Sequence, residues 1–221
     1  MQMRYDSPDG LAAAGPDVSV ALVTAAEGGA AQRALTPAER TRQAAFRHAG
    51  RRAHFALGRL ALRSAAAARL GGSPDGVAIG VAANGAPEVE GLHVSISHGG
   101  AGDAAVGLAA AAGRPVGVDV EPIRARRPDL WRRILRDDER ATLDALGGPS
   151  DRAHTLLWSV KEAVLKGQRT GLRAGARSVR IAPFADGDAG ALDVWSERSG
   201  DWSVRFVRRG DLWLVLAVAA R

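Results

Sequence analysis

The order of secondary structure that the sequence predicts is repeated once along the 221 residues. In the first half, a strand is expected at 17–24, followed by helices and then by strand-like pieces at 77–82, 92–97 and 103–111. In the second half, a strand at 115–121 precedes helices and four more strands near 177–182, 191–196, 202–208 and 211–219. Runs of helices followed by runs of strands are typical of the α+β class. The repeated order therefore predicts a duplicated α+β unit, with halves 1–113 and 114–221.

Two short echoes support the duplication. Residues 35–40 (LTPAER) resemble residues 135–140 (LRDDER), and residues 103–112 (DAAVGLAAAA) resemble residues 211–220 (DLWLVLAVAA). Each echo by itself is weak in an Ala-rich chain, but internal self-similarity is informative when several segments recur in the same order. A site built from both halves would lie in the cleft between them.

Four helices are expected from their end signals. Residues 36–39 (TPAE) form a capping box with Pro at the first helical position, which opens a helix that extends to about Ala49. A second helix at roughly 51–70 ends at a pair of glycines. In the second half, helices are expected near 128–146 and 150–167. The tryptophans outside this last helix are expected in the core or between the halves: Trp131, Trp195, Trp202 and Trp213.

Composition limits the class of protein. Nothing in the chain reaches the roughly 20 consecutive apolar residues that a membrane span needs. The first ten residues have no apolar core of a secretory signal, and the absence of cysteine excludes disulfides and thiol chemistry. The expected compartment is therefore the cytoplasm. The net charge of +6 indicates an anionic partner, which charge alone does not identify.

Two carboxylates lie within the first expected strand of the second half. In residues 116–122 (VGVDVEP), alternation puts Asp119 and Glu121 on one face and valines on the other. Hard oxygen ligands without His or Cys nearby favour Mg²⁺, or alternatively Mn²⁺. The pattern is equally compatible with ordinary acids on an exposed sheet face.

The helix at 150–167 carries a second polar group. Its apolar residues form one stripe, while Trp158, Glu162 and Lys166 follow at i, i+4 and i+8 on the other side. Glu162–Lys166 could be a routine helix salt bridge. A Trp on this face suggests that a ligand or the other half covers it. Glu162 could then complete a three-carboxylate Mg²⁺ site, with Lys166 neutralising a phosphate.

The chain contains only two lysines, Lys161 and Lys166, and every other fixed cation is arginine. Because a compact ammonium is a point-charge binder of phosphate, two lysines in one segment favour phosphate chemistry. The chain has no G-x-x-x-x-G-K-[ST] loop, which excludes a P-loop NTPase.

These segments resemble a known family. Residues 117–121 (GVDVE) and 158–166 (WSVKEAVLK) are similar to the paired signature of the Sfp-type 4′-phosphopantetheinyl transferases, G-x-D-x-E followed by W-S-x-K-E-[AS]-x-x-K. Residues 94–98 (VSISH) resemble the Ser-His motif that precedes that pair in the family. Residues 51–63 resemble the basic helix of its first domain, and the similarity extends over about residues 35–172.

The resemblance implies a pseudo-twofold α+β enzyme, a monomer with coenzyme A in the cleft between its halves. Such an enzyme moves phosphopantetheine from CoA to a serine of an acyl or peptidyl carrier protein and releases 3′,5′-ADP. The first half would contact the CoA phosphates and the second half would hold the metal and the catalytic residues. Carrier proteins of this kind are typically acidic, which suits the positive charge of this chain. Fatty-acid, polyketide, non-ribosomal peptide and siderophore pathways, including secondary metabolism, all remain open.

By motif position, Asp119, Glu121 and Glu162 would hold Mg²⁺ on the CoA diphosphate. Glu162 would also deprotonate the incoming serine, directly or through water, and Lys166 would stabilise charge on the diphosphate and leaving group. The residues that the resemblance implies for CoA binding are Arg52, His54, Ser97, His98, Asp119 and Lys166.

The chain departs from the family pattern in three places. Ala86 stands where the family often has a lysine, Gly99 follows His98 where a small hydroxyl residue is common, and His54 stands where Arg is frequent. These departures affect the expected CoA contacts and leave the metal and base residues complete.

Two rival functions follow from the same residues. One is a Mg²⁺-dependent diphosphate hydrolase that uses the three acids with water as nucleophile, and it predicts CoA breakdown without a carrier protein. The other is a non-enzymatic basic nucleic-acid binder, which predicts steeply salt-dependent binding. Clustered acids disfavour the second rival, because without a metal they repel phosphates.

Overall fold

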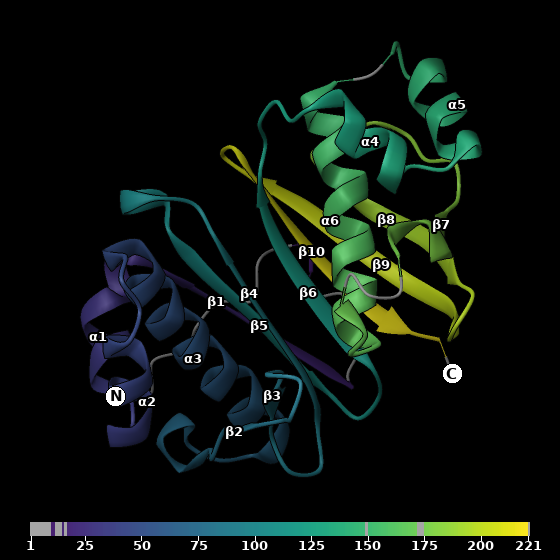
Figure 1. Cartoon of the computed structure of the whole chain (residues 1–221). Coiled ribbons are helices and arrows are strands. Elements are labelled where there is room, and N and C mark those ends of the chain that lie inside the picture. Colours follow the sequence, from purple (N-terminus) through teal and green to yellow (C-terminus); the bar gives the residue numbers. More distant parts are fainter. Residues whose placement is uncertain (1–9, 12–14, 16, 149, 172–174, 221) are drawn as a thin grey trace. The chain divides into compact units, whose positions relative to one another are not determined.

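The computed structural model describes residues 10–11, 15, 17–148, 150–171 and 175–220. The chain divides into two compact units, Met1–Gly113 and Arg114–Arg221, so the division falls where the sequence analysis placed the join. Figure 1 shows both units as helices packed on antiparallel sheets. Of the helices in the described part of the chain, none is both long and apolar enough to cross a membrane.

The first unit packs its helices against a three-stranded antiparallel sheet of order β1-β5-β4. A two-stranded ribbon, β2 with β3, precedes β4 in the chain. The elements are β1 (Val18–Thr24), α1 (Gly28–Arg33), α2 (Pro37–Ala44), α3 (Ala49–Leu70), β2 (Gly80–Val81), β3 (Pro87–Glu88), β4 (His93–Gly99) and β5 (Val106–Ala112).

The second unit packs its helices against a five-stranded antiparallel sheet of order β6-β10-β9-β8-β7. Its outermost strands are therefore β6 and β7, which matters for the site described below. The elements are β6 (Val116–Pro122), α4 (Pro128–Ile134), α5 (Asp137–Ala145), α6 (Asp151–Gly167), β7 (Val179–Ile181), β8 (Ala189–Ser196), β9 (Gly200–Arg209) and β10 (Leu212–Ala219).

The two units share one plan of strand pairing. In each unit the first strand pairs with the last, and the last pairs with the one before it. The registers correspond as well: Val18 lies opposite Ala112 in the first unit, and Val116 lies opposite Val218 in the second. The echo between 103–112 and 211–220 thus reflects equivalent strands, β5 and β10, and the predicted α+β class is confirmed. The pseudo-twofold relation between the units stays a prediction.

The predicted helix boundaries were wrong in two places. The helix that opens at the 36–39 capping box ends at Ala44 instead of Ala49. The segment expected as one helix at 128–146 is two helices, because Glu139 bonds the backbone N–H of Arg136 and begins α5 there. Trp195, expected in the core or between the halves, is 45% exposed on β8 and so lies outside the core.

In the first unit, α3 lies directly on β5 at glycines. A Cβ atom at Gly107 would lie 2.5 Å from the backbone nitrogen of Gly58, and a Cβ at Gly58 would lie 2.8 Å from the side chain of Ile96. Real Cβ contacts are essentially never so short, so the sequence needs glycine for this approach. The core around it is made mainly of alanines and leucines of α3 and of the sheet.

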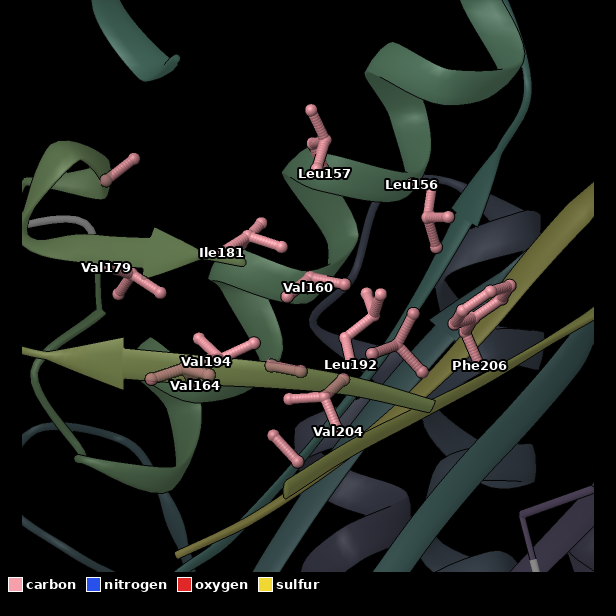
Figure 2. Close-up of a cluster of buried hydrophobic side chains, with 14 of the residues drawn as sticks. Leu156, Leu157, Val160, Val164, Val179, Ile181, Leu192, Val194, Val204 and Phe206 are labelled. Atoms are coloured by element: carbon pink, nitrogen blue, oxygen red, sulfur yellow. The ribbon is translucent and has the colours of Figure 1, made fainter. Parts of the chain in front are cut away.

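In the second unit, one face of α6 carries the apolar stripe that the sequence predicted. Figure 2 shows Leu156, Val160 and Val164 on the helix side facing strands that carry Leu192 and Val204. The stripe repeats at helical spacing, which is what fixes this face against a sheet. The opposite face of α6 is left for polar residues, and it carries the candidate site.

Candidate functional site

The candidate site of the second unit lies where β6 and α6 run close together. A Cβ at Gly117 would overlap the carbonyl oxygen of Ala163 and lie 2.7 Å from the backbone nitrogen of Gly167. Glycine in G-x-D-x-E is therefore required for the helix to approach the strand. Because Asp119 and Glu121 follow on the same strand, the close approach brings both carboxylates to the polar side of α6.

Asp119 is 3% exposed, and both of its oxygens have partners on α6. The Ser159 hydroxyl donates to Oδ2 at 2.8 Å, and the Lys166 ammonium lies 2.5 Å from Oδ1. A buried carboxylate needs such a charge partner and hydrogen bonds to remain ionised. Lys166 thus contacts Asp119 across the helix–strand boundary, a pairing that the sequence analysis did not predict.

Glu121 is held by an aromatic donor and an arginine. The Trp158 indole N–H donates to Oε1 at 3.0 Å, and Arg126, on the segment that follows β6, contacts Oε2 at 2.5 Å. Trp158 is partly buried against the core of its own unit. The position of the Trp158 side chain is therefore explained by its contacts within the second unit, which the sequence analysis did not predict.

Glu162 lies one helical turn after Trp158, and its carboxyl interacts electrostatically with Asp119 and Glu121. The pKa of the Glu162 carboxyl is raised from its ordinary value near 4.5 to about 7. Burial is the largest cause, the Asp119 and Glu121 carboxylates also raise it, and Lys166 lowers it. Burial and like charge both disfavour the ionised form. A carboxyl that titrates near neutrality is suited to exchanging a proton with a hydroxyl group.

The three carboxylates fit Mg²⁺ or Mn²⁺ in donor chemistry, since all are hard oxygen ligands on adjoining elements. Over the described residues, no three His, Cys, Asp or Glu side chains are grouped as a ready-made metal site. Lys166 and Arg126 lie on the oxygens of Asp119 and Glu121 instead. The magnesium site stays a prediction.

Lys161 has a role that the sequence analysis missed. It was grouped with Lys166 as a candidate phosphate binder, yet its side chain is fully buried and its ammonium lies 2.8 Å from Glu139 of α5. The same ammonium donates to the carbonyl oxygens of Ala176 and Val179 at 3.2 and 2.6 Å. Lys161 is thus a buried cation of the second unit. Its place at the edge of the apolar stripe of the 150–167 helix was the sequence signal that could have predicted its burial.

The first unit brings together two of the residues implied for CoA binding. The rings of His54 on α3 and His98 at the end of β4 stack with centroids 4.8 Å apart, and His54 Nε2 lies 3.0 Å from the carbonyl oxygen of Gly100. Ser97 is buried beside His98 on β4, whereas the His98 side chain is exposed. Glycine is required at position 100, where φ is +77° and a Cβ would overlap the backbone of Ala104.

Arg52, also implied for CoA binding, contacts the chain between α2 and α3. Its guanidinium donates to the carbonyl oxygens of Phe46 and Arg47 at 2.7 and 3.2 Å. The side chain therefore stabilises the turn that ends α2 early. Its predicted part in binding CoA stays a prediction, as do those of His54, Ser97 and His98.

Comparison with known proteins agrees with the motifs. Residues 115–216, nearly the whole second unit, match the 4′-phosphopantetheinyl transferase superfamily. A 4′-phosphopantetheinyl transferase from Bacillus subtilis is 29% identical over 135 residues, which cover 59% of this chain and 58% of that relative. The chain thus matches somewhat more than half of the relative's length.

These matches show that the second unit is similar to the 4′-phosphopantetheinyl transferase superfamily. The resemblance that the motifs at 117–121 and 158–166 carry is therefore confirmed for the second unit. Both motifs fall inside the matched region, and the structure brings them together along β6 and α6.

Proposed function

We propose that this protein transfers the 4′-phosphopantetheine group of coenzyme A to a serine of an acyl or peptidyl carrier protein. The observation that carries the proposal is the position of Glu162, a half-buried carboxyl beside Asp119, Glu121 and Lys166, on the segment that matches the superfamily. The relative's printed name supports the same transfer.

In the proposed reaction, the serine hydroxyl oxygen forms a bond to the phosphorus that carries the pantetheine arm. The bond from that phosphorus to the bridging oxygen of the diphosphate breaks, and 3′,5′-ADP leaves with the electron pair. The serine proton passes to Glu162, directly or through a water molecule. A serine hydroxyl is a poor nucleophile, so a base within hydrogen-bond reach is required.

The residues around Glu162 have distinct parts in the proposal. Lys166 supplies positive charge for the diphosphate and the leaving group. To do so, its ammonium must give up its contact with Asp119 and contact a phosphate oxygen instead. Asp119, Glu121 and Glu162 are the residues that would hold Mg²⁺, or Mn²⁺ in its place. When bound, the metal would neutralise phosphate charge, which is the main requirement of phosphoryl transfer.

The first unit supplies the proposed contacts to CoA phosphates. His54 of α3 and His98 of β4 form a stacked pair, and Ser97 directly precedes His98 on β4. Arg52 adds a guanidinium at the start of α3. An acidic carrier protein is the proposed second partner, since the net charge of +6 favours its encounter with this chain. We propose that the enzyme acts as a monomer in the cytoplasm.

Intact-mass spectrometry of a purified apo carrier protein tests the proposal. The carrier is incubated with this protein, CoA and Mg²⁺, and control reactions omit the metal or contain Glu162→Ala. A gain in carrier mass equal to one phosphopantetheine group, absent from both controls, supports transfer. CoA cleavage without carrier modification would instead indicate the hydrolase, and no reaction with acyl and peptidyl carriers alike would contradict the proposed function.

A further inference from the structure

The helix α6 makes polar contacts on two sides. One side contacts Asp119 of β6, and the other side, which carries Lys161, contacts α5 and β7. Lys161 and Ser159 are two residues apart, about 200° around the helix axis, so they lie on the two margins of the apolar stripe. Ser159 bonds Asp119 of β6, and Lys161 bonds Val179 of β7. Since β6 and β7 are the two outermost strands of the sheet, α6 is held by polar contacts at both edges.

The Lys161 contact occupies the free edge of β7. Ser178 and Ala182 exchange backbone hydrogen bonds with the segment that forms β8, so the backbone groups of Val179 and Ile181 point to the other side of β7. There the Val179 carbonyl accepts from Lys161, and the Ile181 N–H donates to Glu139 Oε1 at 3.2 Å. The ion pair thus takes the place that a further strand would fill.

The ion pair is satisfied at nearly every polar atom. The ammonium of Lys161 has three acceptors: Glu139 Oε1, the Ala176 carbonyl and the Val179 carbonyl. Glu139 accepts from Lys161 and Ile181 at Oε1, and from the Arg136 N–H at Oε2. A buried ion pair with so many bonds tolerates little movement, because each displaced atom leaves a buried polar group unpaired.

We propose that Lys161 and Glu139 are positioning residues that fix the rotation of α6 and so hold Glu162 toward Asp119 and Glu121. Glu162 directly follows Lys161 on the helix. The contacts of Ser159, Trp158 and Lys166 with the acids of β6 all lie away from the margin that carries Lys161, so the ion pair with Glu139 is what holds that other margin. This inference rests on the proposed function for its kinetic consequence, while its structural consequence is independent of any activity.

Two variants test the proposal. Lys161→Met removes the cation, and the double variant Glu139→Met with Lys161→Met replaces the ion pair by apolar side chains. The double variant leaves no buried charge unpaired, so it remains informative if Lys161→Met does not fold. Leu192→Ala is the matched control, because it weakens the same core under α6 and leaves every polar contact of the helix in place.

The kinetic readout is the split between kcat and KM, measured at a temperature where each variant is fully folded. Misplacement of a reacting group costs about 10- to 100-fold in rate. We expect kcat to fall by about that factor in both Lys161 variants, with KM for CoA changed less than about threefold. Leu192→Ala should keep kcat within about twofold. Unchanged kcat in the folded double variant would overturn the proposal, as would an equal loss in Leu192→Ala.

An NMR readout separates this inference from the proposed function. The indole N–H of Trp158 donates to Glu121 from the same face of α6 as Glu162, so its cross-peak reports the rotation of the helix. The peak is assigned with Trp158→Phe. It should shift in both Lys161 variants and stay in place in Leu192→Ala. If the wild type transfers nothing to any carrier, the proposed function fails, and an unshifted peak would by itself overturn the positioning role.

Discussion

The two units solve the same packing problem with different cations. In the first unit, Glu39 caps α2 at Thr36 and pairs with two arginines of α3, Arg63 at 2.8 Å and Arg59 at 3.6 Å. In the second unit, Glu139 caps α5 and pairs with a single lysine of α6. The echo between residues 35–40 and 135–140 thus reflects a shared arrangement. In each unit, one glutamate caps a short helix and forms an ion pair with a cationic side chain of the long helix.

The difference lies in how completely each cation is bonded. Arg59 and Arg63 each have an NH1 group that is buried without a hydrogen-bond partner among the described residues. The ammonium of Lys161 instead reaches two backbone carbonyls in addition to Glu139. Duplicated units can therefore keep a common frame while one of them gains a more exacting helix position, and in this chain it is the unit that carries Asp119 and Glu162.

The largest expected difference between the units is catalytic. Glu162→Ala should lower kcat for carrier modification by about 10²–10⁴-fold, because it removes the proposed general base. His98→Ala in the first unit should mainly raise KM for CoA, because it removes a proposed contact with a CoA phosphate. The expected increase is about 10-fold, which corresponds to a loss of about 1.4 kcal/mol of binding free energy. Steady-state kinetics with varied CoA measures both. A kcat loss in His98→Ala as large as in Glu162→Ala would contradict this division of labour.

Removing one cation from each buried ion group should affect stability unequally. Lys161→Met leaves Glu139 buried without a counter-charge, which should cost about 3–5 kcal/mol of unfolding free energy. Arg63→Met leaves Arg59 to neutralise Glu39, so the cost should be about 1–3 kcal/mol. Urea unfolding of the two variants provides the comparison. Equal losses would show that Arg59 does not compensate.

Glycines at the helix–strand contacts should tolerate a methyl group unequally, according to whether it meets backbone or a side chain. Gly117→Ala places a methyl group into the backbone of α6, where nothing can rotate away, and should cost more than about 3 kcal/mol. Gly58→Ala meets only the side chain of Ile96, which can shift, so about 1–2 kcal/mol is expected. For a chain of this size, thermal melting should separate the two variants by several degrees. The reverse order would mean that β6 and α6 do not approach as closely as described.

The smallest expected effect is a pH dependence confined to the second unit. The pKa of Glu162 is raised on folding from near 4.5 to about 7. Below pH 4.5 the group is protonated in both the folded and unfolded states and has no effect on stability. Between pH 4.5 and 7 the unfolded state ionises while the folded carboxyl stays protonated, so stability falls across this window and levels off above about pH 7.

Glu162→Gln should therefore melt at a higher temperature than the wild type at pH 8 without metal, and at about the same temperature at pH 4.5. The gain should be about 1–2 kcal/mol, because solvent screens this partly exposed group. Glu39→Gln in the first unit is the control and should show no such gain at pH 8. Mg²⁺ should stabilise the wild type more than Glu162→Gln, which differential scanning calorimetry can measure.

Much of the fold followed from local pattern in the sequence. The alternation of residues 116–122 predicted β6, the apolar spacing after Ser150 predicted α6, and the glycines after Leu70 predicted the end of α3. These signals are local, because strand and helix periodicities need no knowledge of distant residues. The break between α4 and α5 was missed, since the Glu139 capping box that divides them has Arg136 at its N-cap, where a short polar residue is usual.

The sequence by itself was enough to predict the candidate site residues, because Asp119, Glu121, Glu162 and Lys166 stand in spacings that a strand and a helix convert into one face each. Only the tertiary structure decided what each of them contacts. The contacts of Asp119 with Lys166 and of Lys161 with Glu139 join residues 47 and 22 positions apart. Two lysines in one helix therefore have opposite environments, one half-buried beside an acidic site and one sealed in the core. The physical reason is that charge pairing depends on distance in space and on burial, and periodicity along a chain specifies neither.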